Sequence, residues 1–203
     1  MSRRGSGESG PDRQALLASL QRHPVMATLF GPGSLGPFLD GQCELAIVAN
    51  VDLARLSPLL ALIRRHGKLA FVNIDSCPGL AQDRGGLEFL QAIEAYGVVS
   101  TRSAVIQQGA ALGLRTVRKV FLTDRSNLPR SSSSVASGGA DLVQLMPWPV
   151  LAHVGSARLA PFGSFIAGGF VADCDSIEQA MDLGAVGVST SDTELWDYTR
   201  PDC

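Results

Sequence analysis

Two glycine- and hydroxyl-rich segments in the last third of the chain have the residue types that hold a phosphate. Gly168-Gly169 ends one short apolar run, and Ser189-Thr190-Ser191 ends the next. Glycines let backbone N–H groups approach an anion closely, and the hydroxyls add donors. Ser191 and Glu194 also predict a capped helix, whose N-terminus favours negative charge. A tight turn and a plain helix cap are the alternative, but two such loops in succession favour a phosphate seat formed by Gly168, Gly169, Ser189, Thr190 and Ser191.

A second polar set lies in or after other apolar runs: Asp75, Arg102, Lys119 and Gln144. If these runs are strands of a barrel, their carboxyl ends meet at one mouth, so the four side chains are expected to line a small polar pocket above the phosphate. Lys119 could form a Schiff base there, although a lysine paired with a carboxylate is the favoured interpretation. A surface role at a helix terminus stays open for Arg102.

Few other groups are suited to catalysis. His23, His66 and His153 are not placed as general bases at strand ends, and the sequence has no G-x-S-x-G, no paired carboxylates and no H-x-H metal pair. We therefore predict no catalytic residue, no metal and no cofactor. The alternative is an isomerase- or aldolase-type enzyme on a small phosphorylated metabolite, with Lys119 and Asp75 as its acid–base or nucleophilic pair.

Basic residues gather modestly at turns between helices and strands. The chain carries 17 Lys and Arg against 19 Asp and Glu, a net charge of −2, so it has no overall basic character. An RNA contact would therefore need a local basic face. The candidates for that face are Arg64, Arg65, Lys68, Arg115 and Arg118, although such clusters are also ordinary solvated surface.

Eight short apolar runs recur along the chain, each followed by a turn and an amphipathic segment. Several are nearly continuous in Val, Ile, Leu and Phe, which is typical of buried parallel strands. Eight such units predict a compact (β/α)8 barrel of the TIM type with little decoration, ahead of an open doubly wound sheet, because no G-x-G-x-x-G is present. The predicted strands are Val25–Phe30, Glu44–Ala49, Leu69–Ile74, Gly97–Ser100, Thr116–Leu122, Leu142–Met146, Ser164–Ala167 and Val186–Ser189.

Capping residues predict where the intervening helices begin. The signals are Ser57-Pro58, Asp83, Ser103 and the Asp175/Glu178 pair. Residues 124–140 are expected to form a loop with at most a short helix, because Pro129, Ser131–Ser134 and two glycines are poor helix formers. That loop is either a partner-contact segment or a tolerated variable surface.

The length of 203 residues suits one domain, which we place at residues 14–203 after a flexible tail at 1–13. No apolar stretch approaches the roughly 20 residues of a membrane span, and residues 1–12 contain no apolar core of a signal peptide. The four cysteines are far apart, so a reducing, cytoplasmic location without membrane contact is predicted. The sequence leaves the oligomeric state open.

Several motifs together resemble the glycerol-3-phosphate-responsive antiterminators. The likeness covers roughly residues 45 to 198, and the motifs stand in the family's order: Arg64-Arg65-His66-Gly67-Lys68, Asn73-Ile74-Asp75, Ser100-Thr101-Arg102, Ala167-Gly168-Gly169 and Val188-Ser189-Thr190-Ser191 before Leu195-Trp196. The resemblance implies a (β/α)8 barrel that performs no chemistry, binds glycerol-3-phosphate at its mouth and acts on the leader mRNA of a glycerol-utilisation operon, where it prevents transcription termination. It also implies that Asp75 and Arg102 face the glycerol end of the ligand.

Three positions depart from that family's pattern. Asn73, Gln144 and Trp148 stand where the family usually has His, Glu and Gly. Gln144 can still accept a hydrogen bond from a ligand hydroxyl, but without charge assistance, and Trp148 is expected to crowd the mouth. The phosphate half is intact and the other half altered, so the effector is glycerol-3-phosphate, bound weakly, or a similar small phosphate. A sensor whose effector is a protein is a third hypothesis.

Overall fold

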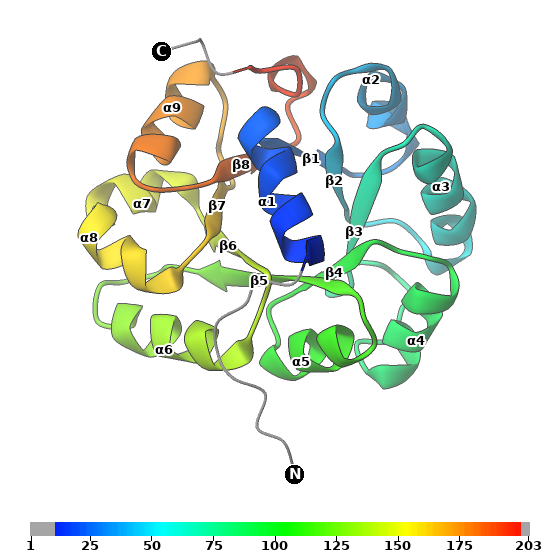
Figure 1. The fold of residues 1–203 in the computed structure, drawn as a ribbon, viewed down its shortest axis with the longest axis horizontal. Helices are drawn as coiled ribbons and strands as arrows, with labels where there is room; N and C mark the ends of the chain where they lie inside the picture. The colour runs from blue at the N-terminus through cyan, green and yellow to red at the C-terminus, as the bar shows by residue number, and fades with distance from the viewer. Residues whose placement is uncertain (1–10, 200–203) are drawn as a thin grey trace.

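The computed structural model describes residues 11–199, and they form a closed barrel of eight parallel strands (Figure 1). Each strand pairs with its neighbours in chain order, and β1 pairs with β8 to close the sheet. The prediction of a compact (β/α)8 barrel is confirmed. The strands are β1 Val25–Leu29, β2 Leu45–Val48, β3 Leu69–Asn73, β4 Gly97–Ser100, β5 Arg115–Phe121, β6 Leu142–Met146, β7 Phe165–Gly168 and β8 Gly187–Thr190.

Helices surround the sheet and pack their apolar sides against its outer face. The helices are α1 Pro11–Arg22, α2 Leu35–Asp40, α3 Leu53–Arg65, α4 Arg84–Ala92, α5 Ser103–Ala111, α6 Leu128–Gly138, α7 Trp148–Val154, α8 Ser156–Leu159 and α9 Cys174–Asp182. Three 3-10 turns complete the chain: η1 Pro32–Ser34, η2 Ala160–Phe162 and η3 Thr193–Leu195. After β8 the short capped helix predicted from Ser191 and Glu194 is the single 3-10 turn η3.

The prediction that residues 124–140 form a loop is wrong, because α6 occupies most of the segment. Pro129 lies in the first turn of α6, where its missing N–H is not needed. Leu128 and Val135 are buried seven residues apart, which anchors one face of the helix. Gly139 ends it in the left-handed conformation, at φ 63°. Tertiary packing and good end signals therefore outweigh weak intrinsic propensity.

The predicted start of α3 is also wrong, because the helix begins at Leu53 and contains Pro58. Leu56, Leu60 and Ile63 form a buried stripe at helical spacing. Burial of Leu56 favours a helix that already begins before Pro58. Asp83 caps α4 as predicted, accepting a hydrogen bond from the Gly86 N–H at 3.0 Å.

The remaining three caps sit one or two residues from their predicted positions. Arg102 is the N-cap of α5, Asp173 caps α9 and Asp192 caps η3.

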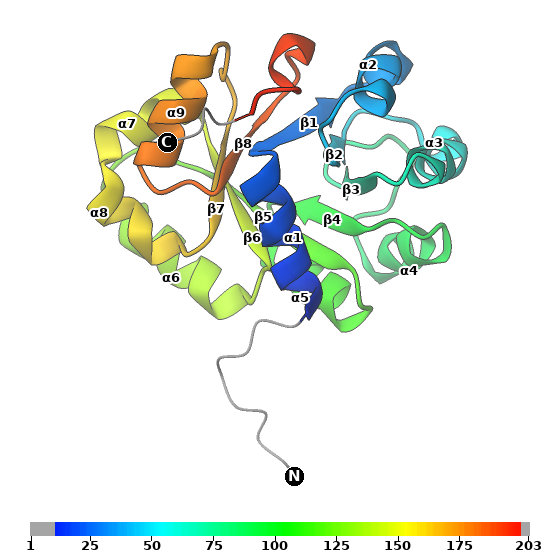
Figure 2. The same cartoon turned by 45° about the horizontal axis from the view of Figure 1, so that its top comes forward.

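Helix α1 seals one end of the barrel (Figures 1 and 2). Leu16 and Leu20 pack into the inward-facing apolar cluster of the strands, which includes Met26, Phe71 and Val117. Arg13 holds the helix in place by donating to the Asp141 carbonyl and to the Ser164 hydroxyl, both next to the amino ends of strands. Helix α1 begins at Pro11, three residues before the predicted start of the domain, and residues 1–10 of the predicted tail lie outside the described residues.

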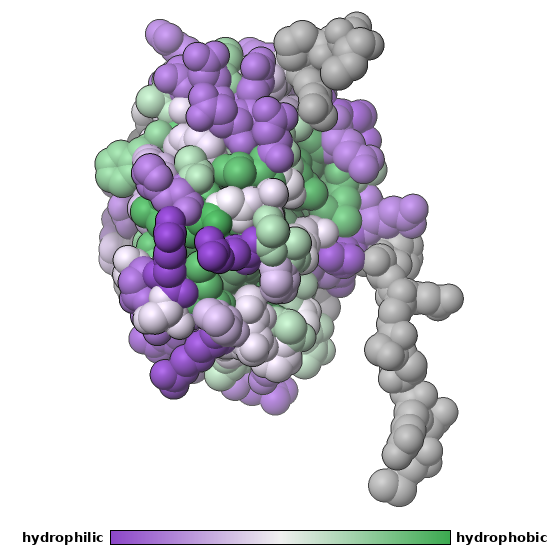
Figure 3. Space-filling view, turned by 90° about the vertical axis from the view of Figure 1, so that its left-hand side faces the viewer, coloured by the Kyte–Doolittle hydropathy of each residue, from purple (hydrophilic) through white to green (hydrophobic). Residues whose placement is uncertain are grey.

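The outer surface on the α7–α9 side mixes hydrophilic side chains with smaller hydrophobic areas (Figure 3). None of the helices in residues 11–199 has the length and apolar character that crossing a bilayer requires. Cys43, Cys77 and Cys174 are free thiols.

Replacing Leu20 by alanine tests whether α1 is an integral part of the barrel. Leu20 is fully buried, so Leu20→Ala should lower the free energy of unfolding by about 2–5 kcal/mol. Gln21→Ala, on the exposed face of the same helix, is the control and should change it by less than about 0.5 kcal/mol. Urea denaturation followed by circular dichroism gives both values. Equal stability of the two variants would mean that α1 is only loosely attached.

Candidate functional site

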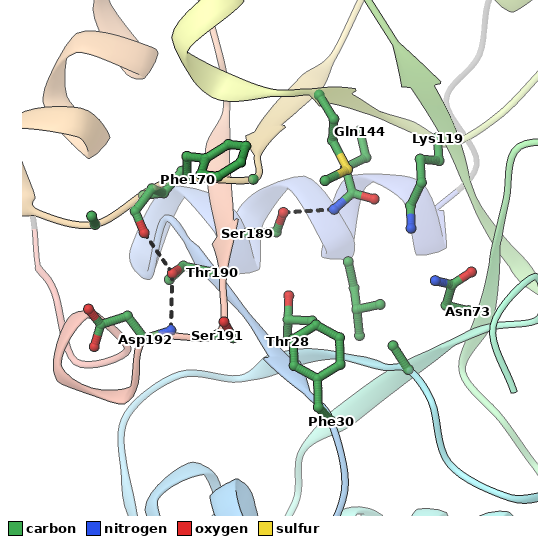
Figure 4. Close-up of a pocket in the computed structure, with 16 residues that line it drawn as sticks. Thr28, Phe30, Asn73, Lys119, Gln144, Phe170, Ser189, Thr190, Ser191 and Asp192 are labelled. Atoms are coloured by element: carbon green, nitrogen blue, oxygen red, sulfur yellow. Dashed lines mark hydrogen bonds between the residues drawn. The ribbon is translucent and has the colours of Figure 1, made fainter.

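A cavity of about 340 Å³ opens at the carboxyl ends of the strands, opposite α1 (Figure 4). Its floor follows from the alternation of side chains along each strand. Phe71, Val117 and Leu142 point inward in the apolar layer, and two residues further along each strand come polar side chains. Those polar side chains are Asn73, Lys119 and Gln144, and they line the cavity together with Thr28 of β1 and Ser189 of β8.

Gly168 of β7 leaves room for a hydrogen bond between side chains of the two strands that flank it, β6 and β8. The Gln144 amide donates to the Ser189 hydroxyl at 2.7 Å, and both side chains are buried. A Cβ at position 168 would lie 2.5 Å from Ser189 Oγ, so the bond passes where a side chain would stand. Gly169 lines the cavity itself with φ +74°, a conformation that favours glycine.

The end of β8 is held by the Thr190 hydroxyl. It donates to the Val171 carbonyl at 2.9 Å and accepts from the Asp192 N–H at 3.1 Å. This hydroxyl is therefore used to join the β7 and β8 loops, while Ser191 lines the cavity as an exposed residue. Asp192 also lines the cavity, but Figure 4 shows its carboxylate pointing away from the centre, and Oδ1 accepts from the Glu194 N–H.

The opposite end of the cavity contains a cation between two amides. Figure 4 shows the Lys119 ammonium directed between Asn73 and Gln144. Burial lowers the pKa of Lys119 below its usual range, and the Asp75 carboxylate partly offsets that effect. The Asn73 Oδ1 and Gln144 Oε1 atoms are buried without a hydrogen-bond partner among the described protein groups. Both oxygens are acceptors that a ligand with hydroxyl donors would satisfy.

Asp75, Arg102 and Trp148 do not line the cavity, in contrast to their predicted positions. Asp75 accepts hydrogen bonds from Ser100 Oγ and from Thr101 N and Oγ1, so its oxygens join the ends of β3 and β4. Arg102 is exposed at the start of α5. Trp148 is buried in the core, and its backbone N–H donates to the Gly169 carbonyl. Met146 forms the cavity wall at this point.

The basic residues predicted to contact RNA do not form one face. Lys68 is buried, and its ammonium donates to the carbonyls of Phe38, Gly41 and Cys43. Arg64 pairs with Glu94 at 2.6 Å, and Arg115 pairs with Asp141 at 3.2 Å. Lys68 is therefore unavailable to RNA.

Arg64 and Arg115 each have a carboxylate beside them, while Arg65 is exposed at the end of α3. Arg118 faces the carboxyl end of β4, where Nη1 donates to the Thr101 carbonyl.

Sequence reasoning missed two aromatic residues at the rim. Phe30 is 57% exposed and Phe170 is 80% exposed, and both line the cavity (Figure 4). Phe170 also has φ 63°, which is unfavourable for a bulky residue. The signal was available in outline, since Phe30 ends the predicted strand Val25–Phe30 and Phe170 follows the Gly168-Gly169 pair. Among residues 11–199, no group of three His, Cys, Asp or Glu side chains could hold a metal ion.

The fold and the cavity define a (β/α)8 barrel protein with a small-molecule-sized site at the carboxyl ends of its strands. The chain belongs to the glycerol-3-phosphate responsive antiterminator family, whose profile matches residues 25–196. The resemblance noted from the sequence motifs is thereby confirmed.

The chain is similar in sequence or in structure to several known proteins. The uncharacterized protein YgcP of Escherichia coli K12 is 26% identical over 186 residues, covering 91% of this chain and 97% of YgcP. A glycerol uptake operon antiterminator regulatory protein from Listeria monocytogenes has a similar structure, with TM-score 0.78 and 21% identity over 85% of this chain and 94% of that one. A glycerol uptake operon antiterminator-related protein from Thermotoga maritima gives TM-score 0.75 and 23% identity over 87% and 99%. At these identities the two structures show a shared fold.

Gly168→Ala tests the close contact between β6, β7 and β8. The added methyl group would displace the Gln144–Ser189 hydrogen bond, so the free energy of unfolding should fall by about 1–3 kcal/mol. Gly138→Ala in α6 is the control, because a Cβ there meets nothing within 4 Å. Thermal unfolding of the two variants measures the difference. A stable Gly168→Ala variant would show that the strands can separate to admit a side chain.

Proposed function

We propose that this protein is a ligand-responsive, RNA-binding transcription antiterminator of a glycerol-utilisation operon, with glycerol-3-phosphate or a similar small phosphate as effector. The observation that carries the proposal is the mouth cavity, which combines a glycine- and hydroxyl-lined side with the half-buried cation of Lys119 between two amide oxygens that have no partner among the described protein groups. Family membership supports a regulatory role. The RNA target would be a leader mRNA, which places the activity in the cytoplasm.

The two ends of the cavity suit the two ends of such an effector. The side formed by Gly169, Ser189 and Ser191 supplies glycine backbone and hydroxyl groups for a phosphate. Asn73 Oδ1 and Gln144 Oε1 accept hydrogen bonds from ligand hydroxyls, and the Lys119 charge favours an anionic ligand overall. Gln144 replaces the carboxylate usual in the family, so its bond to a hydroxyl is neutral and weaker.

Effector binding acts in this proposal by population shift. A ligand that contacts the β7 and β8 loops favours conformations in which those loops are ordered around it. Those loops are joined by the Thr190 hydroxyl, so ordering one loop restrains the other. RNA affinity then depends on the effector to the extent that the RNA contacts the ordered form.

Effector binding is tested by the thermal shift that sn-glycerol-3-phosphate produces. The wild-type chain should gain stability with rising ligand concentration, because the ligand binds only the folded state. Gly169→Val should abolish the shift, since it places a side chain at the phosphate side of the cavity. Gly163→Val is the matched control: Gly163 has nearly the same φ, +73°, but lies away from the cavity. A shift that survives in Gly169→Val would place the phosphate elsewhere.

RNA binding is tested by an electrophoretic mobility assay with the operon's leader RNA. We expect glycerol-3-phosphate to increase RNA affinity about 5- to 150-fold, the usual range of coupling between two sites. The assay is run at low and moderate salt, because phosphate contacts weaken with ionic strength. Absence of RNA binding in both ligand states would refute the RNA part of the proposal, and co-purification of a protein partner would then favour a protein effector.

Lys119 supports a second candidate function, an aldolase-type enzyme. It lies inside the cavity with a pKa lowered by burial, as a Schiff-base lysine requires. Incubation with dihydroxyacetone phosphate and borohydride should then add mass to the wild-type chain and none to Lys119→Met. We expect no adduct in either, because among the described residues that line the cavity the only carboxylate is that of the outward-pointing Asp192, and no histidine is present.

A further inference from the structure

A second cavity, of about 300 Å³, lies between β5 and α6. Its lining contains three basic residues, two serines and one phenylalanine: Arg118, Lys119, Arg130, Ser131, Ser134 and Phe121. The Lys119 ammonium itself points into the mouth cavity (Figure 4), so Arg118 and Arg130 are the cations that belong to this cavity. No carboxylate belongs to the lining among the described residues. Two arginine charges without an acidic partner among the described lining residues favour an anion as the ligand.

The cations around this cavity have unused hydrogen-bonding capacity. Arg118 donates to the Thr101 carbonyl through Nη1, but its Nε is buried and has no partner among the described protein groups. Asp75 is the negative charge that acts on both Arg118 and Lys119, and its oxygens already accept from Ser100 and Thr101. The guanidinium N–H groups are well suited to phosphate oxygens.

The wall formed by α6 is polar toward this cavity. Ser132 and Ser133 donate their hydroxyls back to the Pro129 carbonyl, whereas Ser131 and Ser134 line the cavity beside Arg130. Serine hydroxyls and an arginine on one helix face are typical contacts to a nucleic-acid backbone. The serine run that weakens the helix propensity of α6 thus provides donors for an anion.

Phe121 adds an aromatic surface next to these donors. It ends β5 and is 55% exposed. An isolated exposed phenylalanine is ordinary. Next to the arginines of this cavity, however, an exposed ring is a surface on which a nucleotide base can stack, as in proteins that bind single-stranded RNA.

We propose that this β5–α6 cavity binds one nucleotide of single-stranded RNA, with the phosphate held by Arg118 and Arg130 and the base stacked on Phe121. The inference rests on the proposed RNA-binding function and assigns its location. It also resolves the difficulty of the net charge of −2, because the cations are concentrated at one cavity while the chain as a whole is slightly acidic.

Lys119 connects this RNA site to the effector site, because it lines both cavities. A ligand in one cavity that changes the position or the charge environment of Lys119 also changes the electrostatic potential in the other cavity. Such coupling is reciprocal, so RNA bound between β5 and α6 would alter effector affinity by the same factor.

The site is tested by substitutions at two surface positions, Phe121 and Arg130, in the full chain. Fluorescence anisotropy with a labelled single-stranded RNA of mixed sequence measures the affinity. Phe121→Ala should weaken binding at least about five-fold, which corresponds to loss of one stacked base, and Phe121→Tyr should restore it. Arg130→Gln should reduce the slope of log affinity against log salt by about 0.7, the value for one phosphate contact on a single strand. Arg55→Gln, exposed on α3 on the other side of the barrel from α6 (Figure 1), is the control and should bind as the wild type does.

The outcomes separate this site from the proposed function. If the wild type binds RNA and both Phe121→Ala and Arg130→Gln bind as Arg55→Gln does, the site is refuted and RNA binding stands. If the wild type binds no RNA with or without glycerol-3-phosphate, both are refuted. If Arg130→Gln loses stabilisation by inorganic phosphate while its RNA affinity is unchanged, the cavity holds a free phosphate and the assignment to RNA is wrong. Unchanged glycerol-3-phosphate thermal shifts in both variants would confirm that the effector cavity is intact.

Discussion

The alternation of side chains in a closed, eight-stranded barrel is the constraint on which the rest of this structure depends. In such short strands only two or three residues per strand can point inward. The first inward layer is apolar and is sealed from below by Leu16 and Leu20 of α1, so ligands can enter only from the carboxyl ends. The next inward layer therefore carries the polar groups, and Asn73, Lys119 and Gln144 come together from three different strands without any local sequence motif joining them.

Two lysines, one buried and one half-buried, show how the same residue type takes different roles in this framework. Lys68 is surrounded by carbonyl oxygens of the chain around α2 and lies 4.8 Å from the centre of the Phe38 ring, so its charge is satisfied internally and stabilises the fold. Lys119 has no such cage and faces a cavity between two amide groups. Asn73 Oδ1 and Gln144 Oε1 have no hydrogen-bond partner among the described protein groups, and both side chains line the mouth cavity. That pattern is typical of groups arranged for a ligand and not for the fold.

The sequence predicted the barrel and part of the lining of the mouth cavity. Its misplacement of other residues and elements has physical causes. Apolar runs, several of them nearly continuous in Val, Ile, Leu and Phe, identified all eight strands. Six residues singled out in or after those runs line the cavity: Lys119, Gln144, Gly169, Ser189, Thr190 and Ser191. Asp75 was misplaced because its oxygens are taken by Ser100 and Thr101 across a strand boundary, which spacing cannot reveal. Lys68 was misplaced because burial depends on where the α2 carbonyls lie, and α6 was missed because Leu128 and Val135 are buried by tertiary contacts that propensity ignores.

Strand β5 explains how a small barrel with an unremarkable charge could couple two ligands. Consecutive residues of a strand point to opposite faces, so Arg118 faces the helix layer and Lys119 faces the barrel interior. The two cavities thus share a wall one strand thick, and Lys119 lines both of them. At such short range, in a partly buried environment, charge–charge interactions are weakly screened by salt. A charge placed in the effector cavity therefore acts on the cations of the β5–α6 cavity directly, and no rearrangement of the closed sheet is required for the two sites to influence each other.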